Sequence, residues 1–109
     1  MFQSNVPQIT ADGVQKAINE KKDAILLDVR TPEEYSRGKI DGSINISVEN
    51  IPDQIVAAIP DKNKTIYTYC LSGSRSDVAV AMMKQLGYIN VFSMTNGLLM
   101  WRSKKYPLA

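Results

Sequence analysis

Histidine is absent from the 109-residue sequence, and cysteine occurs once, as Cys70. Without an imidazole, the chain cannot form a Ser-His-Asp or Cys-His catalytic arrangement, and it offers no histidine ligand for zinc or haem. One cysteine cannot form an internal disulfide, a Cys-x-x-Cys redox motif or a multi-cysteine zinc site. Any cysteine chemistry must therefore depend on a single thiol that a group other than histidine activates.

Strong charge and long apolar runs are also lacking. The formal net charge is only +2, which is too small to indicate a nucleic-acid partner or an anionic membrane surface. No apolar run approaches the roughly 20 residues of a membrane-spanning helix. Met1–Thr10 lack a basic patch followed by an apolar core, so we expect no signal peptide and a cytoplasmic location.

What remains is the composition of an ordinary globular domain. The chain is 44% hydrophobic and 22% charged, and 109 residues suffice for one hydrophobic core without disulfides or metals. We therefore expect a single domain over residues 1–109, with a monomer as the simplest assembly.

Short apolar runs alternate with amphipathic segments along the chain. Thr10 can cap a following helix, and Thr31-Pro32-Glu33-Glu34 has the pattern of a capping box with proline in the first turn. Such alternation is typical of an α/β fold with a mostly parallel sheet covered on both faces. The pattern predicts strands at 24–29, 43–46, 65–69 and 90–92, helices at 11–21, 51–59, 76–86 and 98–103, and a short helix between Pro32 and Gly38.

The loop from Cys70 to Arg75 lies between a predicted strand and a predicted helix. The carboxyl ends of strands are where open α/β sheets usually bind ligands. Backbone N–H groups of a tight loop and of a helix N-terminus can converge on one point and bind an anion, and a cysteine placed there is favoured as the thiolate. One interpretation of Cys70 is therefore a reactive thiol that this loop activates.

The neighbours of Cys70 fit that interpretation. Gly73 allows backbone angles that other residues resist, and Arg75 offers a planar set of donors that can fix the loop or hold an anionic substrate. Short hydroxyl donors are available at Ser72, Ser74 and Ser76. A second interpretation stays open, because a lone cysteine at a strand end is often a small core residue, and serine and glycine are ordinary turn residues.

Four segments, in the right order and spacing, resemble signatures of the rhodanese family of sulfurtransferases. Residues 70–75 match the six-residue Cys-x-x-Gly-x-Arg active-site loop of that family. Residues 27–35, 38–46 and 96–101, with Pro107 near the end, match further signatures, so the resemblance runs from about Ile9 to Pro107. Each motif alone is moderately specific, whereas the four together are a strong indication.

The resemblance implies a rhodanese-like three-layer α/β sandwich, with a five-stranded, mostly parallel sheet and helices on both faces. It also implies that Cys70 attacks a sulfur donor such as thiosulfate, becomes a persulfide held by the N–H groups of residues 71–75, and passes the outer sulfur to a thiol or cyanide. No cofactor or metal is expected, and a protein could replace either small molecule as donor or acceptor. The catalytic residues would be Cys70 and Arg75, the substrate-binding residues Leu71, Ser72, Gly73, Ser74 and Ser76, and the supporting residues Asp28 and Arg30.

Three positions depart from the common pattern of the family. Lys39 stands where many members have histidine, Asp41 where many have proline, and Asn96 replaces the first glycine of a frequent pair. Because asparagine tolerates a left-handed backbone, we expect the turn at Asn96 to be kept. Lys39 could influence the choice of acceptor. Asp28 and Arg30 could also be an ordinary surface ion pair, which contributes only about 0–1 kcal/mol.

Two other functions stay open. Cysteine phosphatases and arsenate reductases use a related anion-binding loop, but theirs has five residues between cysteine and arginine, whereas four residues separate Cys70 from Arg75. The smaller loop suits a sulfur atom on Cys70 better than a tetrahedral phosphate. The other alternative is a non-turnover persulfide carrier or an interaction module that binds a partner.

Overall fold

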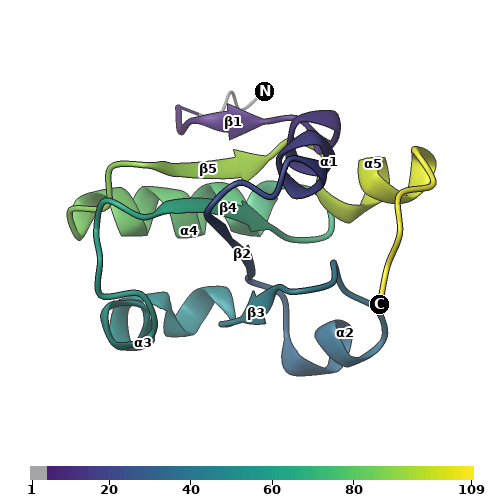
Figure 1. The fold of residues 1–109 in the computed structure, drawn as a ribbon. Helices are drawn as coiled ribbons and strands as arrows, with labels where there is room; N and C mark the ends of the chain where they lie inside the picture. Colours follow the sequence, from purple (N-terminus) through teal and green to yellow (C-terminus); the bar gives the residue numbers. More distant parts are fainter. Residues whose placement is uncertain (1–4) are drawn as a thin grey trace.

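The computed structural model describes residues 5–109. The strands of this part of the chain are β1 (Gln8–Ile9), β2 (Ala24–Asp28), β3 (Ile44–Asn45), β4 (Thr65–Tyr69) and β5 (Val91–Met94). They form one sheet in the order β1-β5-β4-β2-β3, and every neighbouring pair runs parallel (Figure 1). The expectation about a signal peptide at Met1–Thr10 falls partly on residues 1–4, outside the described residues.

Helices cover both faces of this sheet. They are α1 (Ala11–Asn19), α2 (Pro32–Ser36), α3 (Ile51–Ala58), α4 (Ser74–Gln85) and α5 (Gly97–Ser103), and a 3-10 turn, η1 (Val48–Asn50), precedes α3. Buried side chains of α3 and α4 pack on one face with Leu27 and Ile66, and those of α1 and α5 pack on the other with Tyr69 and Met94. The expected three-layer α/β sandwich with a five-stranded sheet is therefore confirmed. None of the helices in residues 5–109 has both the length and the hydrophobicity of a membrane-spanning segment.

The two threonines that we expected as helix caps do cap their helices. Oγ1 of Thr10 accepts the N–H of Gly13 at 3.0 Å at the start of α1. At the start of α2, Oγ1 of Thr31 accepts the N–H of Glu34 at 3.2 Å, and the Glu34 carboxylate accepts the N–H of Thr31 at 3.1 Å. The predicted capping box is thus confirmed. It also holds the Glu34 carboxylate in one orientation.

Some element boundaries differ from those that the sequence predicts. Helix α4 begins at Ser74, two residues earlier than expected, because Gly73 adopts φ = +108° and its carbonyl accepts the N–H of Asp77 at 3.0 Å. Arg75 therefore lies in the first turn of a helix rather than in a loop. Strand β5 extends to Met94, and the two-residue strand β1 is too short to produce an apolar pattern.

The parallel pairing brings the carboxyl ends of the strands to one edge of the sheet. The register sets Asp28 opposite Tyr69, and Thr68 opposite Ser93, so β2, β4 and β5 end at similar levels. The segments that leave these strands therefore start side by side. Cys70, the residue after β4, lies between the segments that follow β2 and β5.

Candidate active site

Cys70 is fully buried, with 0% of its surface exposed, and backbone donors face its sulfur. Its Sγ accepts the N–H of Gly73 at 3.1 Å and the N–H of Ser76 at 3.4 Å. An ordinary apolar position in the core does not direct two N–H groups at a side chain, whereas such donors stabilise a thiolate. Although Cys70 also belongs to the core cluster on the α4 face, this geometry supports the interpretation as a reactive thiol.

Gly73 makes the convergence on the sulfur possible. Its φ of +108° lies in the left-handed region, where glycine is favoured, and this turn directs its N–H at Cys70. A Cβ at Gly73 would lie 3.4 Å from the backbone nitrogen of Asn96, an ordinary contact, so glycine is required here by backbone conformation rather than by space. The N-terminal end of α4 thus faces Cys70, where its partial positive charge of about half an elementary charge favours an anion.

Two buried hydroxyl groups lie beside the sulfur and its loop. Oγ of Ser76 is 3.6 Å from Sγ of Cys70 and donates to the carbonyl of Gly73 at 3.1 Å. It is also 2.6 Å from Oγ of Ser93 in β5, and both serines are fully buried. Ser93 was not predicted from the sequence, although a single polar residue within the otherwise apolar strand Val91–Met94 was a signal.

Not every predicted substrate-binding residue contacts the sulfur. Among residues 71–75, all of which the structure describes, only Gly73 donates its N–H to Sγ of Cys70. Ser72 and Ser74 are exposed at the surface, and Leu71 packs in the cluster on the opposite face of the sheet. The contacts expected from these residues concern a persulfide or a bound substrate, and they stay predictions.

Arg75 binds a carboxylate of the protein itself. Its Nη1 and Nη2 donate to the two carboxylate oxygens of Glu34 at 2.7 and 3.1 Å. These bonds lower the pKa of Glu34 from 4.5 to about 2 and raise the pKa of Arg75. Because Glu34 belongs to the capping box of α2, the pair ties the first turn of α4 to α2. Of the two roles expected for Arg75, the geometry favours holding the loop, so we interpret it as a positioning residue.

Asp28 and Arg30 form a buried ion pair, so the alternative of a surface pair is wrong. They are 0% and 3% exposed. Nη2 of Arg30 donates to Oδ2 of Asp28 and to the carbonyl of Gly38, both at 2.7 Å. The guanidinium also lies 6.0 Å from the ring centroid of Tyr69, the residue before Cys70. Because a buried charge cannot be left without its partner at low cost, the pair fixes the turn that follows β2, and the bond to Gly38 joins this turn to the segment after α2.

Helix α5 begins directly against the cysteine loop. The N–H of Leu98 donates to the carbonyl of Cys70 at 3.0 Å. Gly97 permits this approach, because a Cβ there would lie only 2.4 Å from the same carbonyl oxygen. Asn96 has φ = +61°, so the expected left-handed turn is confirmed. The sequence indicated this turn, but it did not reveal that Gly97 packs on the backbone of the loop.

Known proteins resemble this chain over most of its length. The family model described as a rhodanese-like domain matches residues 10–104. The chain belongs to the rhodanese family. The thiosulfate sulfurtransferase PspE of Escherichia coli is 38% identical over 65 residues, which cover 60% of this chain and 62% of that protein. A sulfurtransferase of Allochromatium vinosum is 30% identical over 103 residues, which cover 94% of each chain. The crystal structure of a rhodanese-related protein from Thermoplasma volcanium has a TM-score of 0.82 and 31% identity, and the match covers 94% of this chain and 97% of that one.

Lys39 and Asp41 are the two remaining departures from the common rhodanese pattern. Nζ of Lys39 lies 4.8 Å from the ring centroid of Tyr35. The backbone of Lys39 pairs with that of Ala109, which brings the C-terminus beside α2 (Figure 1). Asp41 is exposed. An influence of Lys39 on the choice of acceptor stays a prediction.

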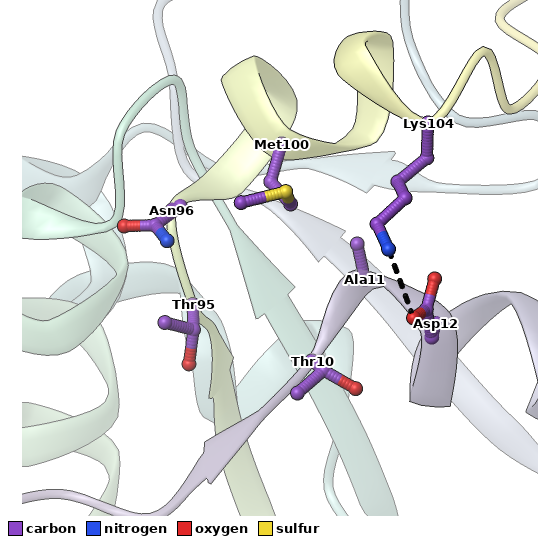
Figure 2. Close-up of a pocket in the computed structure, with 7 residues that line it drawn as sticks. All are labelled: Thr10, Ala11, Asp12, Thr95, Asn96, Met100 and Lys104. Carbon is purple, nitrogen blue, oxygen red and sulfur yellow. Dashed lines mark hydrogen bonds and ion pairs between the residues drawn. The ribbon is translucent and has the colours of Figure 1, made fainter.

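A cavity of about 180 Å³ opens at the edge of the sheet where the carboxyl ends of the strands lie, next to the ends of β1 and β5 (Figure 2). Figure 2 shows Nζ of Lys104 directed at the carboxylate of Asp12, at 3.2 Å. The cavity is lined by Thr10, Ala11, Asp12, Thr95, Asn96, Met100 and Lys104. None of the residues predicted for the sulfur site lines it.

No metal centre is visible in the part of this rhodanese that the structure describes. Across residues 5–109, no group of three or more His, Cys, Asp or Glu side chains is placed to hold a metal ion. The expectation that the protein needs no cofactor stays a prediction.

Proposed function

We propose that this rhodanese is a sulfurtransferase in which Cys70 carries a sulfane sulfur, as a persulfide, from a donor such as thiosulfate to a thiophilic acceptor. The observation that carries the proposal is the convergence of the Gly73 and Ser76 N–H groups on the sulfur of the only cysteine. Relatives named as sulfurtransferases support the class of reaction.

The reaction consists of two displacements at sulfur. In the first, the thiolate of Cys70 attacks the outer sulfur of thiosulfate. A bond forms between these two sulfur atoms, the bond to the sulfonate sulfur breaks, and sulfite leaves with the electron pair. In the second, a thiolate or cyanide attacks the outer sulfur of the persulfide, and the electron pair of the broken bond returns to Cys70. Because no net electrons enter or leave the protein, no redox cofactor is needed, and ping-pong kinetics are expected.

The groups around the sulfur have distinct tasks in these steps. The N–H groups of Gly73 and Ser76 stabilise Sγ when it is the attacking thiolate and again when it is the leaving group. No general base is needed where the thiolate already exists, in keeping with the absence of histidine. Arg75 acts indirectly, because its bonds to Glu34 hold the first turn of α4, and with it the N–H of Ser76, in place.

Intact-mass spectrometry tests the proposal. Incubation with thiosulfate, and separately with a small-molecule persulfide, should add one sulfur atom to the protein. Cyanide should then remove that atom and release thiocyanate. The Cys70→Ser variant lacks the thiol and should gain nothing. A wild-type protein that gains no sulfur from either donor, or an equal gain in Cys70→Ser, would contradict the proposal.

A non-turnover persulfide carrier is the second candidate. The relatives of the chain include a putative sulfur carrier protein of Bacillus subtilis. Steady-state thiocyanate formation distinguishes the candidates, because an enzyme releases many equivalents per protein whereas a carrier releases one and stops. A protein donor or acceptor, a monomeric state, a cytoplasmic location and the lack of a nucleic-acid or membrane partner stay predictions.

The geometry disfavours a cysteine phosphatase. Both terminal nitrogens of Arg75 are bonded to Glu34, so this guanidinium is not presented to a phosphate. We expect no hydrolysis of an aryl phosphate. Turnover that disappears in Cys70→Ser would overturn this expectation.

A further inference from the structure

Ser93 places a hydroxyl group inside the core, on the face of the sheet that α4 covers. The residue is fully buried, and its Oγ lies 2.6 Å from Oγ of Ser76. Within residues 5–109, this is the only hydrogen bond that the Ser93 side chain makes. Burying a hydroxyl is unfavourable unless it is bonded, so the pairing with Ser76 is the reason that Ser93 can occupy this position.

Counting protons sets the direction of the bonds around Ser76. Within residues 5–109 the Ser93 hydroxyl has no acceptor other than Oγ of Ser76, so both hydroxyl protons are satisfied only when the single proton of Ser76 is directed at the carbonyl of Gly73, at 3.1 Å. Ser93 must then donate to Ser76. The thiol of Cys70 donates to the remaining lone pair of Ser76, at 3.6 Å. In this arrangement every polar hydrogen of the three side chains has an acceptor.

An anionic sulfur changes this arrangement at one point. A thiolate has no proton to donate, and it attracts a donor. The Ser76 hydroxyl can rotate its proton from the carbonyl of Gly73 to Sγ of Cys70, because Ser93 still donates to the oxygen of Ser76. A hydrogen bond to a charged acceptor is stronger than one to a neutral acceptor, and a donor that is itself hydrogen-bonded is polarised further.

We propose that Ser93 is a positioning residue that holds the Ser76 hydroxyl beside the sulfur and strengthens it as a donor when Cys70 is anionic. This inference rests on the proposed function for its role in sulfur transfer. Ser93 lies in β5, and its side chain is linked to the reacting sulfur by hydrogen bonds through Ser76.

The neighbouring strand offers a matched control. Thr68 of β4 lies opposite Ser93 in the register and is also fully buried. Its Oγ1 makes no hydrogen bond within residues 5–109. Thr68→Val therefore removes a buried hydroxyl from the same layer without touching the Ser76–Ser93 pair, and it should leave the reactivity of Cys70 unchanged.

The experiment measures the rate of sulfur loading from thiosulfate by intact mass, as a function of thiosulfate concentration. In Ser93→Ala, the limiting rate should fall about three- to tenfold, the effect of one lost hydrogen bond. The half-saturating concentration should stay the same, because a buried Ser93 does not touch the donor. Alkylation of Cys70 by iodoacetamide at one fixed pH should slow by a similar factor. Thr68→Val should match the wild type in both assays.

A double-mutant cycle decides whether Ser93 acts through Ser76. Ser76→Ala should slow both reactions about tenfold or more, and adding Ser93→Ala should cause no further loss. Additive losses, a wild-type rate in Ser93→Ala, or an equal loss in Thr68→Val would overturn the inference. Alkylation needs no sulfur donor, so a protein that loads no sulfur contradicts the proposed function, whereas the alkylation rates of the same variants still test Ser93.

Discussion

The approach of α5 to the cysteine loop depends on one residue, Gly97. Its φ is +49°, and a Cβ would lie 2.4 Å from the carbonyl oxygen of Cys70, where the backbone cannot yield easily. Gly97→Ala should therefore lower the free energy of unfolding by about 2–4 kcal/mol, from the left-handed backbone and the overpacking together. Urea denaturation measures this loss.

Gly42 is the control for that measurement. It also has a left-handed φ, +84°, but a Cβ there would meet nothing within 4 Å. Gly42→Ala should cost only the backbone term of about 1–2 kcal/mol. Equal losses in the two variants would show that the contact between Gly97 and the loop does not matter.

The bond between Glu34 and Arg75 predicts a pH dependence of stability. The pKa of Glu34 is about 2 in the folded protein, below its ordinary value of 4.5. The carboxylate therefore contributes stability that is fully present above about pH 4.5 and is lost as the pH falls towards 2. Glu34→Gln should lower the free energy of unfolding by about 1 kcal/mol at neutral pH, and this difference should vanish near pH 2.

Glu33 provides the matched variant for this prediction. It lies in the same turn of α2 and is exposed, and no ion pair to it is found in residues 5–109. Glu33→Gln should change stability little at any pH. A loss in Glu34→Gln that persists unchanged at pH 2 would mean that its carboxylate charge is not the source.

At the scale of single residues, the sequence predicted features that depend on neighbouring residues better than contacts between residues far apart in the chain. The capping box at Thr31 and the left-handed Asn96 follow from neighbouring residues, and both are confirmed. The partner of Arg75 is 41 positions away, and such a pairing leaves no trace in a single sequence. The Asp28–Arg30 pair was expected, but its burial depends on how the chain packs around it, and the surface alternative was wrong.

At the scale of elements, the two capped helices differ in their connection to the site. Both begin with a threonine whose Oγ1 accepts a backbone N–H, so Thr31→Ala and Thr10→Ala should each cost about 1 kcal/mol. Only the Thr31 cap also holds Glu34, and through it Arg75 and α4. We therefore predict that Thr31→Ala slows alkylation of Cys70, whereas Thr10→Ala does not. Equal alkylation rates in the two variants would argue against coupling of α2 to the sulfur.

Strand and helix boundaries show where periodicity stops being informative. Four strands have recognisable apolar patterns, but β1 contains only two residues and has none. Helix α4 begins at Ser74 because Gly73 adopts a left-handed backbone angle directly before it. The position of this turn depends on the backbone conformation of Gly73 rather than on a hydrophobic pattern. This error mattered for function, since it placed Arg75 in a loop instead of in the first helical turn.

At the scale of the whole molecule, two apolar clusters share one sheet. The cluster with α3 and α4 and the cluster with α1 and α5 lie on opposite faces, and both include residues of β4. We predict a single cooperative unfolding transition, because neither cluster can be lost while the other keeps its sheet. Trp101, the only tryptophan, reports on one face by fluorescence, and far-ultraviolet circular dichroism reports on all helices. Midpoints in urea that differ between these probes would contradict the prediction.

The depth of Cys70 has a consequence for storage and oxidation. Two folded copies cannot bring their sulfur atoms to the disulfide length of about 2 Å while each thiol is covered by its own chain. We therefore expect air oxidation to crosslink this protein into covalent dimers more slowly than it would a protein with a surface thiol. Such a crosslink would be hard to reverse here, because the chain has no second cysteine to resolve it. Burial of Cys70 thus protects the only thiol of the chain from intermolecular disulfide formation.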